Sequence, residues 1–315
     1  MQTALITGVL GQDGSFLSAL LKEKGYRVVG LDLAAGPAAP GVEVLTGDVS
    51  SAESVSAAVQ AAKPSEIYHL AGQSSVARSF ADPAGAFKST ALSTLHVLEA
   101  ARAQSPAPRV LVAASGEIFG DTAGARATER TPFQPGSPYA AAKSSAASLV
   151  KSYRASFGMS CSVAYFYNHE SSRRPETFVT RKIVRAACKI ARGLEAKLEL
   201  GDTSVIRDWG FAPEYMNAAW LMLQQQTAED LVIATGESCS LEHFLDRAFQ
   251  RVGLDYRAHV TKNPAFFRAA EIPAMYADPS RAAERLGWRA ETHVDALVDQ
   301  LVAAEQRELD GEGRR

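Results

Sequence analysis

The chain has 315 residues and a formal net charge of -2, with 33 Lys plus Arg against 35 Asp plus Glu. This length can build a large core, either as one extended α/β domain or as a domain with a smaller lobe, and it is long enough for an enzyme. The balanced charge argues against a nucleic-acid surface, and no apolar run approaches the ~20 residues that span a bilayer. Cys161, Cys188 and Cys239 are far apart without metal-ligand spacing, and no apolar leader segment follows a basic start, so we expect free thiols in a cytoplasmic protein with no metal site.

A glycine-rich segment near the N-terminus follows a short apolar run, residues 4–6, that is typical of a buried strand. Gly8, Gly11 and Gly14 lie in this segment, and a helical pattern continues from it to Lys24. Glycines at such a strand-to-helix junction let the backbone approach a pyrophosphate at the helix N-terminus. The segment therefore predicts dinucleotide binding, and the alternative is a plain glycine-rich turn.

The second strand pattern, residues 27–32, ends in a carboxylate about 20 residues after the glycines. Asp32 could accept hydrogen bonds from an adenosine ribose and would repel a 2′-phosphate, which favours NAD over NADP. The alternative is a surface Asp at a strand end. After a third strand pattern at 42–45, Asp48 could reach the adenine amino group.

Strand and helix patterns go on alternating through the first half of the chain. They cover strands 67–72, 110–114 and 162–167 and helices 52–62 and 86–104. The alternation predicts an α/β protein with a Rossmann-type doubly wound parallel sheet. We expect a dinucleotide-binding domain over 1–168 and a smaller substrate lobe mainly over 169–315, with the chain free to cross between them. His69 lies among apolar strand residues, so we expect it to be packed and not catalytic.

Tyr139 and Lys143 are four residues apart in an Ala-rich stretch that begins after the turn-forming Ser137 and Pro138. A helix would place both side chains on one face. An ammonium group near a phenol favours the phenolate, so the pair is a candidate base. The alternative is an ordinary amphipathic helix pair.

A dense run of polar residues, 168–182, directly follows the strand pattern at 162–167. Polar residues at a strand end favour a site loop over a solvated charged turn. The remaining patterns are helices at 180–193, 213–226, 240–252 and 293–308 and a strand at 231–234.

The chain resembles extended short-chain dehydrogenases/reductases over its first 170 residues, and the GDP-mannose 4,6-dehydratase family over nearly its whole length. The broad resemblance rests on Thr7-Gly8-x-x-Gly11-x-x-Gly14, Asp48, Ser115 and Tyr139-x-x-x-Lys143. The narrower one rests on Gly11-Gln12-Asp13-Gly14-Ser15, Asn168-His169-Glu170-Ser171, Arg173 to Lys182, Arg207-Asp208-Trp209-Gly210, Arg268 with Glu271, and Asp278 to Trp288.

The resemblance implies roles for three groups of residues. The catalytic residues would be Ser115, Glu117, Tyr139 and Lys143. The cofactor-binding residues would be Gly8, Gly11, Gln12, Asp13, Gly14, Asp32, Asp48, Val49, Leu70, Ala71, Tyr139 and Lys143. The GDP-sugar site would be formed by Asn168, Glu176, Val179, Lys182, Arg207, Arg268 and Glu271, among which Arg and Lys can neutralise a diphosphate. A surface salt bridge is the alternative for any one of these arginines.

Two positions depart from the family pattern. Gly116 stands between Ser115 and Glu117, where the dehydratases have Ser or Asp, and Ser-Gly-Glu is equally close to GDP-4-keto-6-deoxy-mannose reductases. The family's arginine-rich loop after the second strand, which serves NADP and tetramer formation, is replaced by residues 33–40, and no basic residue occurs between Arg27 and Lys63. The lack of basic residues in 33–40 supports NAD as the cofactor, with NADP as the alternative.

The expected function is internal redox dehydration of a GDP-hexose, GDP-mannose first, to the 4-keto-6-deoxy sugar. The alternatives are a GDP-4-keto-6-deoxy-sugar reductase, an epimerase of the same superfamily, or a non-catalytic nucleotide-sugar sensor. Resemblance to extended members of the superfamily also implies a homodimer formed through helices 86–104 and 138–157. We expect the small residues of the second helix to permit its close approach: Ala140, Ala141, Ala142, Ala146 and Ala147.

Overall fold

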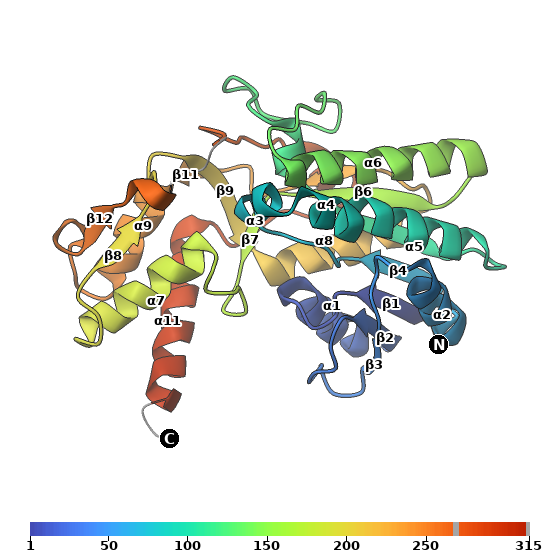
Figure 1. Cartoon of the computed structure of the whole chain (residues 1–315), viewed down its shortest axis with the longest axis horizontal. Coiled ribbons are helices and arrows are strands. Elements are labelled where there is room, and N and C mark those ends of the chain that lie inside the picture. The colour runs from blue at the N-terminus through green and yellow to red at the C-terminus, as the bar shows by residue number, and fades with distance from the viewer. Residues whose placement is uncertain (267–270, 313–315) are drawn as a thin grey trace.

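Seven parallel strands form the central sheet of the computed structural model, which describes residues 1–266 and 271–312 (Figure 1). The strand order is β10-β6-β5-β4-β1-β2-β3. The strands are β1 (Thr3–Thr7), β2 (Arg27–Asp32), β3 (Glu43–Thr46), β4 (Glu66–His69), β5 (Arg109–Ser115), β6 (Cys161–Phe166) and β10 (Leu231–Ile233). Since every pairing in it is parallel, the sheet needs helical crossovers on its faces.

Helices cover both faces of this sheet. One face carries α1 (Gln12–Glu23), α8 (Ala212–Gln224) and α10 (Ser280–Leu286), and the other carries α2 (Ala52–Ala62), α5 (Ser93–Arg102) and α6 (Pro138–Phe157). A separate apolar core fills each of the two layers. The Rossmann-type doubly wound fold expected from the sequence is confirmed.

A smaller lobe lies beside the carboxyl ends of the strands, on the left in Figure 1. It has its own apolar core and two small sheets, ordered β11-β9-β7 and β12-β8. Its elements are β7 (Asn168–Glu170), α7 (Val179–Ala191), β8 (Leu198–Leu200), β9 (Ile206–Phe211), β11 (Ser238–Ser240), α9 (Leu241–Arg251), β12 (Val260–Lys262) and α11 (Val294–Glu312). The chain crosses between the two parts, because α8 and β10 return to the central sheet.

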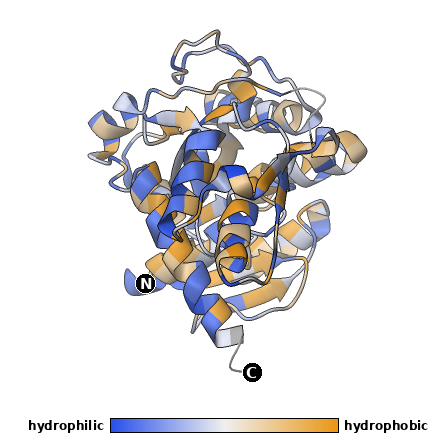
Figure 2. Cartoon of the chain, turned by 90° about the vertical axis from the view of Figure 1, so that its left-hand side faces the viewer, coloured by the Kyte–Doolittle hydropathy of each residue, from blue (hydrophilic) through white to orange (hydrophobic). Residues whose placement is uncertain are grey.

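Buried ion pairs join α7 to the C-terminal helix α11. Arg181 Nη1 lies 2.7 Å from Glu305 Oε2, and Arg185 Nη1 lies 2.9 Å from Glu305 Oε1. The Glu305 side chain is fully buried. Figure 2, which views the molecule from the lobe side, shows hydrophilic and hydrophobic stretches alternating along the helices of this side. The pairs hold α7 in place, and α7 supplies residues to the cavity described below.

Several local predictions from the sequence need correction. The expected strand 67–72 ends at His69, and the expected helix 86–104 is divided into α4 (Pro83–Phe87), a π-helical turn at 88–92 and α5. The Asp82 carboxylate starts α4 by accepting the Gly85 N–H at 2.9 Å. The short helix α3 (Val76–Ala81) was not expected, because six residues are too few to show a helical period.

The expected packing of His69 is confirmed. Its ring is buried and lies 2.8 Å from Thr7 Oγ1 and 3.0 Å from Ser93 Oγ. Burial lowers the pKa of His69 to about 3, with a smaller effect of the Lys143 charge. The side chain is therefore a neutral structural histidine.

Over residues 1–266 and 271–312, no helix is both long and apolar enough to cross a bilayer. The three cysteines are free thiols, as expected, with Cys161 and Cys188 buried.

Candidate active site

A cavity of about 830 Å³ lies between the carboxyl ends of the central strands and the smaller lobe. Ligand sites in open α/β sheets occur at this edge. From the large domain the cavity is lined by Asp13, Leu70, Ser115, Glu117, Tyr139 and Lys143. From the lobe it is lined by Asn168, Glu176, Val179, Lys182, Arg207 and Glu271. Expected catalytic and substrate residues thus share one space, while Arg268 lies outside the described residues.

The glycine loop between β1 and α1 fits a dinucleotide pyrophosphate. Gly8 has a φ of +73°, and a Cβ atom at Gly14 would lie 2.2 Å from the Gly8 carbonyl oxygen. These positions admit no side chain, so the backbone can approach a ligand at the start of α1, where free N–H groups favour an anion. Gln12 and Asp13 form the first turn of α1.

The residues expected to hold the adenosine half lie beyond the cavity, along the carboxyl ends of β1 to β4. Asp32 ends β2, and its Oδ2 accepts the Leu10 N–H of the glycine loop at 2.9 Å. Asp48 accepts the Ser50 N–H at 2.8 Å. Val49 and Ala71 follow β3 and β4 in the chain. The Asp32 carboxylate therefore lies beside the loop that would carry a pyrophosphate.

Tyr139 and Lys143 lie in the first turns of α6, which begins where the Ser137 hydroxyl accepts the Ala140 N–H. Burial raises the pKa of Tyr139 to about 12, a hydrogen bond with Ser115 opposes this rise, and the Glu117 charge adds to it. Burial lowers the pKa of Lys143 to about 8.

The Lys143 ammonium donates to the main-chain oxygen of Ala113 at 2.6 Å. In the protein alone the pKa of Tyr139 is raised and not lowered, because burial outweighs the hydrogen bond with Ser115 and the charge of Arg174. A phenol with a pKa of about 12 is neutral near pH 7.

Gly116 packs directly on the ring of Tyr167. A Cβ atom at Gly116 would lie 2.8 Å from Tyr167 Cε2 and 2.9 Å from Cζ. The ring is buried, and its hydroxyl donates to the main-chain oxygen of Tyr276 at 3.2 Å. The Tyr167 ring therefore fills the space that a side chain at position 116, next to Glu117, would occupy.

The polar segment after β6 is hydrogen-bonded to the first turn of α1. His169 Nε2 lies 2.9 Å from Asp13 Oδ2, and Gln12 Nε2 donates to the His169 carbonyl at 3.1 Å. The Ser171 hydroxyl donates to Gln12 Oε1 at 2.8 Å. Two segments 157 positions apart in the chain are therefore joined, and Asp13 and His169 of these segments line the cavity.

The sequence pattern placed this segment at a site but did not single out Glu170 or Arg174. Both line the cavity, and Arg174 Nε lies 3.2 Å from Glu170 Oε2. The Thr180 hydroxyl donates to the same carboxylate at 2.7 Å. Their place in the polar run 168–182 was the available signal. No comparable signal marked Phe80 of α3, which also lines the cavity.

Charged side chains of the lobe line the far end of the cavity. Arg207 is buried, and its Nη2 lies 2.6 Å from Glu271 Oε1. Lys182 donates to the Glu199 carbonyl at 2.7 Å and lies 4.1 Å from the centre of the Phe266 ring. Glu176 is largely exposed and pairs with Arg185 Nε at 3.1 Å.

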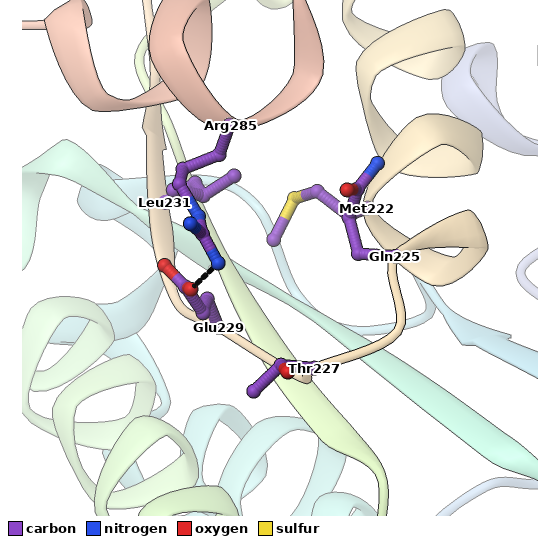
Figure 3. A pocket seen from close by; sticks show the side chains of 6 residues that line it. All are labelled: Met222, Gln225, Thr227, Glu229, Leu231 and Arg285. Carbon is purple, nitrogen blue, oxygen red and sulfur yellow. Dashed lines mark hydrogen bonds and ion pairs between the residues drawn. The ribbon is translucent and has the colours of Figure 1, made fainter.

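A second cavity lies elsewhere in the large domain and is far smaller. It measures about 10 Å³ and is lined by Glu229, Arg285 and four neighbours (Figure 3). This is room for about one water molecule, and an ion pair between Glu229 and Arg285 spans it.

The fold and the Ser115, Tyr139 and Lys143 set define the chain as an extended short-chain dehydrogenase/reductase. The solved complex of Thermus thermophilus UDP-glucose 4-epimerase with NAD is similar, with a TM-score of 0.86, 25% identity, and coverage of 97% of this chain and 99% of that one.

A model of the family described as GDP-mannose 4,6 dehydratase matches residues 5–301. GDP-mannose 4,6 dehydratase 1 of Arabidopsis thaliana is 40% identical over 319 residues, which covers 95% of this chain and 88% of that protein. GDP-mannose 4,6-dehydratase of Vibrio cholerae is 36% identical over 343 residues, which covers 95% and 92%. The chain belongs to the GDP-mannose 4,6-dehydratase family, and the resemblance inferred from its motifs is confirmed.

Proposed function

We propose that the protein converts GDP-mannose into GDP-4-keto-6-deoxymannose with net loss of one water. The observation that carries the proposal is one cavity that holds Tyr139 and Glu117 together with Lys182 and Arg207. The first two residues offer a base for a hydroxyl and a base for a carbon acid. The other two offer positive charge for a diphosphate.

A nicotinamide dinucleotide, when bound, supplies reversible hydride transfer and positive charge. Tyr139 then removes the proton of the C4 hydroxyl, because added positive charge offsets the burial that keeps its phenol neutral. Ser115, which hydrogen-bonds Tyr139, orients the phenol. Lys143 supports it from the next turn of α6.

Glu117 carries out the elimination. A ketone at C4 acidifies the C5 hydrogen, so a carboxylate can remove that proton while the C6 hydroxyl leaves with a proton as water. Glu117 lies in the helical turn 116–119 that follows β5, beside Tyr139. Removal of the C5 proton and loss of the C6 hydroxyl take away one water, and the balance for the 4-keto-6-deoxy product requires the hydride from C4 to end at C6 and a proton to end at C5.

The lobe residues hold the GDP moiety. Arg207 is suited to bidentate contact with a phosphate, and Lys182 adds a point charge. Glu271 accepts from hydroxyl groups, and Asn168 and Val179 line the wall. Glu176 is also part of the proposed GDP-sugar site, where it pairs with Arg185. We include Arg268 in the same proposed site.

The proposed cofactor is NAD. The cofactor-binding residues would be those of the glycine loop with Gln12 and Asp13, followed by Asp32, Asp48, Val49, Leu70 and Ala71. Asp32 lies beside the loop and would face a 2′-phosphate with like charge, and no basic residue follows it before Lys63. The similar Thermus epimerase is a complex with NAD. NADP is the alternative.

The test is incubation of the purified protein with GDP-mannose and a catalytic amount of NAD. Mass spectrometry should show a product lighter by one water. Recovery of unchanged GDP-mannose with both cofactors would contradict the proposal for this substrate.

A second candidate is a reductase of a GDP-4-keto sugar, or an epimerase, using Tyr139 and Lys143 without elimination. Gly116 favours it, because no side chain there assists a leaving group. A reductase consumes one reduced nicotinamide per product, whereas the dehydratase consumes none. If the protein were only a sensor, Tyr139→Phe would leave GDP binding unchanged and there would be no turnover to lose.

A homodimer through α5 and α6 also stays a proposal. Its support is a group of exposed apolar side chains on and beside these helices: Phe87, Leu92 and Phe157. The expected role of the alanines is wrong for Ala140, Ala142, Ala146 and Ala147, which are fully buried against this chain's own core. Light scattering tests the dimer, and a monomer mass would exclude it.

Free thiols fit a cytoplasmic location, which we propose. We also propose that residues 1–168 act mainly on the cofactor and 169–315 mainly on the GDP-sugar, with α8 and β10 as structural exceptions.

A further inference from the structure

His169 lies between two hydrogen-bond acceptors. Its Nδ1 is 2.8 Å from the carbonyl oxygen of Tyr167, and its Nε2 is 2.9 Å from Oδ2 of Asp13. A main-chain carbonyl cannot donate, and a carboxylate cannot donate unless it is protonated. Both ring nitrogens therefore need a hydrogen, which makes the ring an imidazolium cation.

The Asp13 side is a carboxylate and not an acid. Its pKa is lowered to about 2, because burial is outweighed by the His169 charge and by hydrogen bonds from His169 and Gln12. Gln12 Nε2 donates to Oδ1 at 3.0 Å, so both carboxylate oxygens have donors. The pair is thus an ion pair that lines the cavity, with the His169 side chain about 10% exposed and the Asp13 side chain about 23% exposed.

The surroundings of His169 contain few other charges among the described residues. Burial lowers the pKa of His169, and Arg174 from the loop after β7 lowers it further, but the charge and hydrogen bond of Asp13 and the contact with the Tyr167 carbonyl raise it overall. The ring centre of Tyr215 on α8 lies 4.9 Å from that of His169, in a stacked arrangement, and the ring centre of Phe166 on β6 lies 5.3 Å from it. In the small sheet, His169 of β7 is paired with Gly210 of β9.

The pair lies in the same cavity as Tyr139. The Asp13 carboxylate raises the pKa of Tyr139, and Arg174 lowers it. An Asp13 charge without its counter-ion would therefore oppose formation of the phenolate. A positive group fixed on Asp13 removes that effect.

We propose that His169 is a positioning residue, held permanently as an imidazolium, that fixes the Asp13 carboxylate and balances its charge beside Tyr139. The same contact joins the glycine loop to the lobe-side strand β7. The link to catalysis rests on the proposed function, whereas the charge state of His169 does not.

The first experiment measures that charge state directly by ¹⁵N NMR of histidine-labelled wild-type protein, so that no variant has to fold. The chain has six histidines, and His169 is assigned as the signal lost in His169→Gln. Because the two contacts raise the pKa of His169 above the ordinary 6.5, we expect both of its nitrogens to be protonated at pH 7.5. A neutral His169 at pH 7.5 would overturn the proposal, even in an active dehydratase.

The second experiment compares the pH dependence of kcat/KM for His169→Gln and for the double variant Asp13→Asn/His169→Gln. The single variant leaves an unbalanced carboxylate, so its acid limb should move to higher pH. The double variant carries neither charge, so its acid limb should return toward that of the wild type. Equal loss of rate with no shift in either profile would show a purely structural role and refute the charge-balancing claim.

Discussion

The ring of Tyr167 occupies the space that a side chain at Gly116 would need, since a Cβ atom there would lie 2.8 Å from Cε2. Tyr167 lines the cavity, and Gly116 directly precedes Glu117, which lines it too. The glycine is therefore part of a packed pair, and the site cannot gain a side chain at 116 without moving the ring.

Gly116→Ser should lower both stability and turnover. Overpacking in a well-filled region costs about 1–3 kcal/mol, and displacement of Tyr167 would also disturb Glu117. Urea unfolding and initial rates check this. Gly136→Ser is the matched control, because nothing lies within 4 Å of a Cβ there. A fully stable and more active Gly116→Ser protein would contradict the packing argument.

Breaking the buried contact between α7 and α11 should destabilise the lobe. Glu305→Gln leaves Arg181 and Arg185 without their shared buried carboxylate, and loss of one partner of a buried pair costs about 3–5 kcal/mol. Glu195→Gln removes a partly exposed partner of Lys189 and should change the unfolding free energy by less than about 1 kcal/mol. Equal effects of the two variants in urea unfolding would contradict this difference.

Stability should fall as the solution is acidified below pH 6.5, partly through His69. Its folded pKa of about 3 lies below the ordinary 6.5, so the unfolded state binds the proton first. The loss should approach about 1.4 kcal/mol per pH unit between these values. His69→Gln should show a smaller slope of unfolding free energy against pH, and an unchanged slope would show that His69 does not remain neutral.

Cofactor preference should depend on Asp32. A carboxylate about 4 Å from a phosphate costs a few kcal/mol at an effective dielectric near 20, which is a hundredfold or more in affinity. Asp32→Asn keeps an acceptor for the Leu10 N–H but loses the charge, so NADP binding should tighten relative to NAD. Calorimetric titration measures both, and tighter binding of NADP to the wild type would contradict the assignment.

Much of the large domain could be predicted because its strands and helices are long enough to show their periods, as in β1, β2 and α6. The three-residue strands of the lobe, which are β7, β8, β11 and β12, and the short helix α3 carry too few residues for a period. The sequence predicted Arg207 and Glu271 only as separate residues of one ligand site. Their ion pair could not be predicted, because no sequence spacing relates residues that are 64 positions apart. The neutral state of Tyr139 could not be predicted, because it depends on burial in the folded chain.

The most direct test of the central claim follows one hydrogen. GDP-mannose that carries deuterium at C4 is incubated with the protein and a catalytic amount of NAD, and the product is analysed by mass spectrometry and NMR. Internal redox dehydration predicts a product lighter by one water, with the deuterium at C6 and no net change in cofactor. A product that lacks deuterium at C6, or one formed only with stoichiometric reduced cofactor, would contradict it.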